Sequence, residues 1–263
     1  MEKHLAFFFF LLYNHIGYTE PLRRFICIYQ KEFIMKETKK FTKLEVLYFI
    51  LMAFSSGIVI GIGGVSSLLA NELFGKAGRL IGATLFTVGI YAIVMFEMKL
   101  FTGMVASIPK MGAKNMWQLP VCFLGNIVGV GVVAVLAYFS PLKDAGIIGK
   151  AQDVMLGKLN AEFWYLRAFC SSILCGSLIT LSVWSVKYAP KKSLSATLGV
   201  IFPIIVFAFC GFDHSVANML YIYYLGQWRW EIIPYCILSI AGNIVGGIIL
   251  PLFYLLKERI NAQ

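Results

Sequence analysis

The stretch GFDHSVANM at residues 211–219 lies within a hydrophobic run that is long enough to cross a membrane. An ionisable side chain in hydrocarbon is costly unless it faces a partner or a water-filled path. His214 is the only histidine in such a run, because the other two lie within residues 1–15. We therefore predict a functional site around His214. The alternative is a structural histidine that satisfies a neighbouring backbone group.

The composition is that of a polytopic membrane protein. Of the 263 residues, 59% are hydrophobic and only 14% are charged, and the mean hydropathy is +0.79. Too little polar surface exists to cover a soluble domain of this size. The net charge of +10 does not indicate nucleic acid binding, because the basic residues sit in short segments between apolar runs. The lipid bilayer is thus the expected partner.

Metal and cofactor chemistry are not indicated. The six cysteines form no CxxC pair, so neither a metal site nor a disulfide framework is expected. The GIGG at residues 61–64 is too short and too deep in an apolar run to be a dinucleotide loop. The sequence also contains no HExxH or GxSxG motif. We expect no cofactor and no enzymatic activity.

The chain divides into an N-terminal extension, residues 1–34, and a channel domain, residues 35–263. The apolar run at residues 5–13 is too short to span a bilayer, which takes about 20 residues. It also lacks the clear features of a secretory signal. Met35 opens MKETKKFTK, which resembles an ordinary cytoplasmic start, so the first segment is either an extension or an upstream mis-start.

Hydropathy predicts an all-α membrane protein with six transmembrane helices. With both termini inside, the cytoplasmic segments hold eleven basic and three acidic residues, against six and five outside. The positive-inside rule therefore places both termini in the cytoplasm, with the chain in the cell membrane. The predicted crossings are residues 44–70, 80–108, 117–139, 163–186, 195–225 and 231–256.

Two of these runs are broken by polar residues, and the breaks are related by a repeat. The second run contains EMKLFTGM at residues 97–104, and the fifth contains GFDHSVANM. The pentapeptide GNIVG occurs at residues 125–129 and again at 242–246, an offset of 117 residues that pairs Phe101 with Asn218. Two inverted three-helix repeats, with helices two and five broken near the midplane, explain this pattern. The glycines of GNIVG predict close helix packing.

At these residues the chain resembles the formate/nitrite transporter family. Members carry a helix-two break of the type (D/E)LFTG, a helix-five motif GF(E/D)HSxANM and GNxxG motifs in helices three and six. The resemblance covers about residues 36–257. It implies a homopentamer of aquaporin-like protomers, each passing small monovalent anions or their conjugate acids, such as formate, nitrite or hydrosulfide.

The resemblance also assigns roles by position. His214 would be the central pore histidine, with Thr102 and Asn218 as its polar neighbours. The loop in the broken second helix, a proposed gate, would hold Leu100 and Phe101 beside Thr102. The other assigned positions are the hydrophobic constrictions, Phe86, Ile90, Ile179 and Phe207, and the vestibule charges, Lys158, Lys99 and Glu97.

Two positions depart from the family pattern. Lys99 precedes LFT where the family usually has an acid, and the nearest carboxylate is Glu97. Either a local ion pair or an added positive field near the anion path would explain this. Gly176 stands where the family has a helix-four asparagine. Both changes resemble the hydrosulfide branch more than the formate branch.

These residues suggest a mechanism and leave alternatives open. A small anion in a hydrophobic constriction pays a large desolvation cost, whereas its neutral acid pays far less. His214, with its charged form disfavoured by hydrophobic rings, would hydrogen-bond the anion or transfer a proton to it. The main hypothesis is a channel; the alternative is a proton-coupled formate/nitrite symporter, and the remote one is an intramembrane enzyme or receptor.

Overall fold

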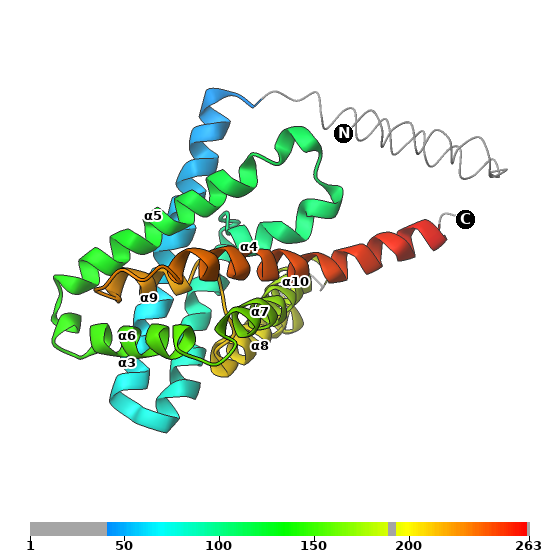
Figure 1. Ribbon diagram of the computed structural model, residues 1–263. Coiled ribbons are helices and arrows are strands. Elements are labelled where there is room, and N and C mark those ends of the chain that lie inside the picture. Colours follow the sequence, from blue (N-terminus) through cyan, green and yellow to red (C-terminus); the bar gives the residue numbers. More distant parts are fainter. Residues whose placement is uncertain (1–40, 189–192, 262–263) are drawn as a thin grey trace.

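The computed structural model of the chain describes residues 41–188 and 193–261 (Figure 1). Every regular element in these two ranges is a helix. The predicted N-terminal extension, residues 1–34, lies outside the described residues. The α-helices are α3 (Lys43–Met95), α4 (Phe101–Met104), α5 (Gln118–Tyr138), α6 (Ile147–Leu159), α7 (Trp164–Tyr188), α8 (Leu194–Cys210), α9 (Asn218–Tyr224) and α10 (Ile232–Asn261). Three short 3-10 turns connect them: η1 (Val105–Lys110), η2 (Ala113–Asn115) and η3 (Pro141–Lys143).

Helix α3 is two helices joined at a reversal. It begins with a capping box, in which Thr42 and Glu45 satisfy each other's backbone N–H groups. At Gly75 the backbone takes φ +53° and ψ −124°, a conformation open in practice only to glycine. The chain turns back on itself there, as the blue-to-cyan ribbon shows (Figure 1). The first predicted crossing and most of the second therefore both lie in α3.

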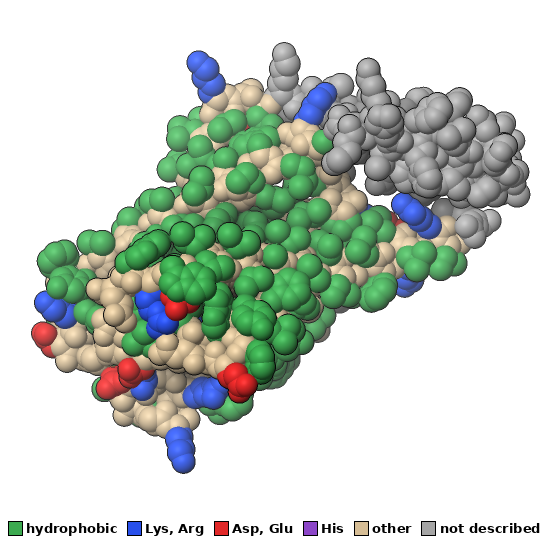
Figure 2. All heavy atoms as spheres, in the orientation of Figure 1, with side chains coloured by type: hydrophobic (Ala, Val, Ile, Leu, Met, Phe, Trp, Pro, Cys, Tyr) green, Lys and Arg blue, Asp and Glu red, His purple; other side chains and the backbone are tan. Residues whose placement is uncertain are grey.

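Long apolar helices make this a multi-pass membrane protein. Four stretches are long and apolar enough to cross a bilayer, namely Lys43–Met95, Ala113–Tyr138, Trp164–Lys187 and Ile232–Asn261. The shorter apolar helix Leu194–Cys210 accompanies them. Hydrophobic side chains cover most of the visible surface, while charged ones gather towards its ends (Figure 2). Such a surface is stable against lipid but not against water.

Two helical rods are interrupted by non-helical backbone. Helix α3 ends at Met95, and α4 begins only at Phe101 before running into η1. Helix α8 ends at Cys210, with Gly211 in the left-handed conformation at φ +72°, and α9 begins at Asn218. These interruptions lie at the positions of EMKLFTGM and GFDHSVANM.

The GNIVG glycines allow pairs of helices to touch backbone to backbone. Helix α5 packs on α3, and α10 packs on α7. A Cβ added at Gly129 would lie 2.2 Å from the Phe54 carbonyl oxygen, and one at Gly246 would lie 1.9 Å from the Ile173 carbonyl oxygen. No side chain fits at either distance, so the predicted packing role of these glycines is confirmed.

Candidate functional site

The asparagine of the first GNIVG motif holds the interruption between α3 and α4. Asn126 Oδ1 accepts a hydrogen bond of 2.9 Å from the Phe101 N–H. Its Nδ2 donates to the carbonyls of Ala53, at 2.8 Å, and Lys99, at 2.9 Å. Backbone that leaves a helix at membrane depth needs such partners, because water is not available to it. One amide thus satisfies two backbone groups at the α4 end of the interruption and ties them to Ala53 of α3.

The asparagine of the second motif does the same between α8 and α9. Asn243 Oδ1 accepts from the Ser215 N–H at 2.9 Å, and Nδ2 donates to the carbonyls of Asp213, at 2.9 Å, and Ser172, at 2.8 Å. Ser215 thus donates to Asn243 as Phe101 donates to Asn126, and in this pattern of hydrogen bonds the two residues are equivalent. The Ser215 hydroxyl is itself buried and has no hydrogen-bond partner among the described residues.

The two correspondences differ by three positions, since the offset of the motifs pairs Phe101 with Asn218. Asn218 is where α9 resumes, as Phe101 is where α4 begins. The turn at residues 215–217 that precedes α9 accounts for the difference. Periodicity alone could not reveal it, because it depends on which backbone groups each amide reaches.

His214 lies between the two interrupted segments. Its side chain is only 1% exposed, and Nε2 is 3.0 Å from Thr102 Oγ1. The Ala217 N–H donates to Nδ1 at 3.1 Å. A nitrogen that accepts carries no hydrogen, so the ring is the neutral tautomer with its hydrogen on Nε2, which donates to Thr102.

Aromatic rings line one side of this histidine. The Phe207 ring stacks on the imidazole, with centroids 5.7 Å apart and an interplanar angle of 28°. Phe86 meets Phe207 edge-on at 5.6 Å. Ile90 and Ile179 are fully buried. The rings of Phe86 and Phe207 therefore contact each other, and that of Phe207 contacts the histidine.

The predicted gate residues lie in the turn that Asn126 holds. Leu100 and Phe101 are 3% and 4% exposed. The Phe101 ring packs against Phe123 of α5, with centroids 5.0 Å apart. Thr102 is fully buried, and its contact with His214 brings the two halves of the site together.

A second polar cluster is centred on Asp213. Its Oδ1 accepts from Lys158 Nζ at 2.6 Å, from Asn218 Nδ2 at 2.9 Å and from the Tyr235 hydroxyl. Asn218 Nδ2 also donates to the Tyr235 oxygen at 2.8 Å. Asn218 was predicted as a neighbour of the His214 ring, but its side chain contacts Asp213 and Tyr235 instead. With His214 it shares only a backbone hydrogen bond of 2.9 Å.

Tyr235 was not identified from the sequence. It is 1% exposed and reaches Asp213 from α10. The only available signal was a polar hydroxyl near the start of an apolar helix, where tyrosines also occur as ordinary interfacial residues.

The predicted vestibule charges are placed differently from one another. Lys158, on α6, pairs with Asp213 and also donates to the Gly211 carbonyl at 3.1 Å. Its charge is thus balanced by a buried carboxylate. Glu97 is exposed with φ +52°, and Lys99 is partly buried. None of the ion pairs within the described ranges joins Glu97 to Lys99, so the local ion pair considered for them does not form.

Gly176, the second departure, faces another helix. A Cβ at this position would lie 2.4 Å from the Asn243 carbonyl oxygen and 2.9 Å from its Cα. Any side chain at position 176 would force α7 and α10 apart. The glycine is required by helix packing, whatever its relation to the anion path.

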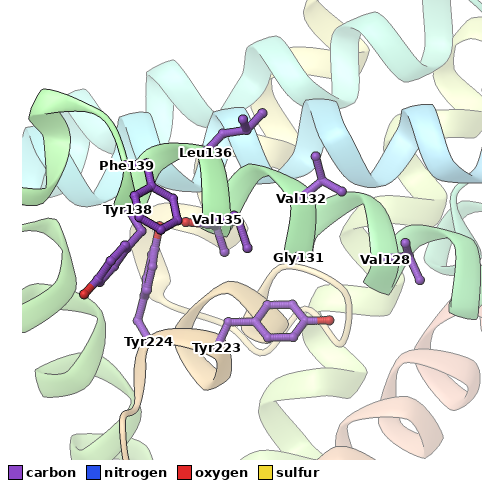
Figure 3. Close-up of a pocket in the computed structure, with 10 residues that line it drawn as sticks. Val128, Gly131, Val132, Val135, Leu136, Tyr138, Phe139, Tyr223 and Tyr224 are labelled. Carbon is purple, nitrogen blue, oxygen red and sulfur yellow. The ribbon is translucent and has the colours of Figure 1, made fainter.

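Two pockets lie away from the histidine. An apolar groove of about 610 Å³ runs between α5 and α9, where Tyr223 and Tyr224 face the valines of α5 (Figure 3). A smaller pocket of about 210 Å³ lies beside α4 and η1 and includes Gly103, Ser107, Lys110, Trp184 and Lys187. His214 lines neither of them. In the part of the chain that the structure describes, no cluster of His, Cys, Asp or Glu could hold a metal ion.

Several known proteins resemble this chain in sequence. A family model described as formate/nitrite transporter matches residues 31–256. An uncharacterized transporter of Bacillus subtilis is 29% identical over 225 residues, covering 78% of this chain and 82% of its own. A probable formate transporter of Methanothermobacter thermautotrophicus is 29% identical over 238 residues, covering 76% of this chain and 84% of its own.

Solved structures share the fold. A pentameric formate channel with formate bound superposes with a TM-score of 0.69 at 24% identity, covering 83% of this chain and all of that one. An ion channel described as belonging to the FNT family gives a TM-score of 0.68 at 20% identity, covering 91% of this chain and 99% of that one. At these identities the likeness shows the fold alone.

Proposed function

Because the chain belongs to the formate/nitrite transporter family, we propose that it is a channel for small monovalent anions or their conjugate acids, of the formate, nitrite and hydrosulfide class. The observation that carries the proposal is the Thr102–His214 hydrogen bond, which joins two interrupted helical segments at a buried centre. A transporter of this family needs no catalytic set, in accord with the expectation that the chain is not an enzyme.

The proposal includes a topology of six crossings in two inverted three-helix repeats. It rests on the reversal at Gly75 and on the matching hydrogen bonds of Asn126 and Asn243. Both termini then lie in the cytoplasm, and the channel lies in the cell membrane. Residues 35–263 form the channel domain, and residues 1–34 are an extension; the family match begins at residue 31. Assembly as a homopentamer is proposed from the pentameric neighbour.

At the centre, Thr102 would be the group that meets the anion. Because Thr102 Oγ1 accepts the Nε2–H of His214, its own hydroxyl hydrogen is left to donate elsewhere. A hydroxyl hydrogen-bonded in this way is a stronger donor, since hydrogen bonds in a chain polarise one another. The histidine would therefore act on the anion through the threonine, because both of its ring nitrogens are already hydrogen-bonded.

The same geometry favours hydrogen bonding over proton transfer as the role of His214. A second proton would sit on Nδ1, where the Ala217 N–H already points. Two donors would then face each other, at a cost of about 1–3 kcal/mol for the lost bond and the buried, unsatisfied groups. A proton relay therefore requires that residues 214–217 move.

The hydrophobic constrictions would select against hydrated ions. Phe86 and Phe207 would form one constriction, in which Phe207 contacts His214. Ile90 and Ile179, both fully buried, are the other proposed constriction residues. Leu100 is proposed as the gate on the α4 side. A pore narrowed by such residues admits an anion only after it has shed water, so weak acids that pass partly as neutral molecules have the advantage.

Liposome flux tests the proposal directly. Formate, nitrite, hydrosulfide and chloride are compared side by side across a range of pH, with protein-free liposomes as the control. The weak-acid anions should pass faster than chloride; a preference for chloride would overturn the proposal.

The second candidate, a proton-coupled symporter, is separated by a gradient experiment. A symporter would accumulate formate against its own gradient when a pH gradient is imposed, beyond what diffusion of formic acid through protein-free liposomes gives. A channel would only equilibrate it.

Of the two departures that favour hydrosulfide, only Lys99 remains near the proposed path, because Gly176 faces α10.

A further inference from the structure

The pocket beside α4 has the composition of an anion site. It lies where η1 and α7 meet, with two lysines, Lys110 and Lys187, and the hydroxyl of Ser107 on its wall. Its volume of about 210 Å³ holds a small anion with a few water molecules. The two ammonium groups are donors that suit a monovalent anion, whereas the Ser107 hydroxyl already donates to the Met104 carbonyl at 2.6 Å.

This pocket is next to the centre of the site. Its lining includes Gly103, the residue that follows Thr102. A Cβ at Gly103 would come within 3.3 Å of Val183 Cγ2, so α4 and α7 lie close together on this side of the pocket. An anion held in the pocket would be one residue away from the Thr102–His214 pair.

Lys110 already forms an ion pair with a carboxylate in this structure. Glu258, near the end of α10, places its two oxygens 2.9 Å and 2.7 Å from Lys110 Nζ. A carboxylate group is also the charged part of formate. The lysine is therefore positioned to bind this chemical group, and Glu258 is the group that any incoming anion must displace.

The pair is exposed enough to exchange. The Lys110 and Glu258 side chains retain 46% and 49% of their accessible surface. Ion pairs this exposed contribute little net free energy, because both charges remain hydrated when they separate. An anion at the pocket can thus replace Glu258 without a large structural change.

We propose that Lys110 is an anion-binding residue at the cytoplasmic mouth and that Glu258 is its tethered competitor. The side of the membrane and the kind of anion rest on the proposed function; the competition itself rests only on the pocket and the ion pair. Anions in the cytoplasm would release Glu258 from Lys110, and their absence would let the ion pair reform.

Iodide quenching of Trp184, which lines the pocket, tests the competition without measuring transport. In a purified variant, phenylalanine replaces the other tryptophans, Trp117, Trp164, Trp228 and Trp230. Glu258→Gln should raise the quenching constant about twofold to fivefold, the range expected for releasing an exposed pair. Formate added as a competitor should reverse the increase.

A matched control removes the same charge elsewhere. Glu72 forms a comparable exposed ion pair with Lys150, 3.5 Å apart, so Glu72→Gln should leave the quenching unchanged. Adding Lys110→Gln to Glu258→Gln should remove the rise in the quenching constant. An equal rise in Glu72→Gln, no rise in Glu258→Gln, or a gain that survives loss of Lys110 would each overturn the proposal. Quenching is measured without transport, so the two proposals can fail separately. If the protein transports anions but fails the quenching test, only the role of Glu258 as a competitor is refuted. If it passes the quenching test but transports none of the anions, only the channel proposal is refuted.

Discussion

Thr102 Oγ1 and His214 Nε2 lie 3.0 Å apart although 112 residues separate them in the sequence. Thr102 follows one non-helical segment and His214 lies within the other, and each segment is held by the asparagine of a GNIVG motif. The contact therefore depends on two separate supports, one from α5 and one from α10. Changes at the contact, at the supports and at the neighbouring Asp213 cluster should have different effects.

His214→Asn should reduce weak-acid flux about tenfold, the effect of losing one hydrogen bond of about 1.4 kcal/mol at the bottleneck. A change in the pH dependence of flux beyond this loss would show that His214 also transfers protons. Oligomer size in detergent should not change. Liposome flux from pH 5 to 8 measures this, with Asn160→Ala, an exposed position, as the control. Unaltered flux and pH profile would refute any role of His214 in transport.

Asn126→Leu and Asn243→Leu should each destabilise the protein by about 3 kcal/mol, because three buried backbone groups lose their partner in either variant. Thermal unfolding in detergent measures the loss. The two effects should be similar in size. A large effect at one asparagine and none at the other would argue against equivalent supports.

Tyr235→Phe should cost more stability than Tyr224→Phe. Both hydroxyls are buried, but Tyr235 donates to the Asp213 carboxylate, whereas Tyr224 donates to the Ala134 carbonyl at 2.8 Å. Hydrogen bonds to charged groups contribute about 1.5–3 kcal/mol, against about 1 kcal/mol for neutral ones. The same thermal unfolding assay compares them. Equal losses would mean that the Asp213 contact has no special weight.

Lys158→Gln should lower anion flux, because it leaves the Asp213 carboxylate uncompensated next to the path. Breaking one side of a buried pair also costs about 3–5 kcal/mol, an upper value here since Lys158 is 20% exposed. Adding Asp213→Asn should recover part of both losses. If the double variant is no better than Lys158→Gln, the lysine acts by its own charge and not through Asp213.

The loop before α10 should loosen only in acid. Hydrogen bonds from Arg229 lower the pKa of the Glu231 carboxyl from its usual 4.5. A lowered folded-state pKa contributes stability that is present above 4.5 and lost as pH falls through the folded value. Protease cleavage of the loop should therefore begin below pH 4.5. In Arg229→Gln it should begin at higher pH, and an unchanged onset would show that the pair does not hold the loop.

The sequence predicted the main elements of this site because its strongest signals are local. The repeated GNIVG, the polar residues within apolar runs and a lone intramembrane histidine each occupy a few consecutive positions. They located both interruptions, and the family resemblance assigned Thr102 as a neighbour of His214. The family resemblance added the aromatic constriction at Phe86 and Phe207.

What the sequence did not predict depends on side-chain direction between distant helices. Asn218 follows His214 by only four positions, yet its side chain points to Asp213. Tyr235 of α10 hydrogen-bonds to both Asn218 and Asp213 there. Lys110 and Glu258 are 148 residues apart, and no periodicity relates them. The role of the GNIVG asparagines was hidden by their glycines, which explain the motif through packing alone.

The hydrogen bonds of Asn126 also limit how the proposed gate residue, Leu100, can move. Displacing the backbone at residues 99–101 would break three hydrogen bonds: Asn126 to the Phe101 N–H, Asn126 to the Lys99 carbonyl, and the Lys99 N–H to the Met52 carbonyl. At about 1 kcal/mol each, such a displaced state would be populated less than about 1% of the time. Opening should therefore proceed by rotation of the Leu100 side chain on a fixed backbone, on the nanosecond timescale of rotamer changes rather than the slower one of loop movement.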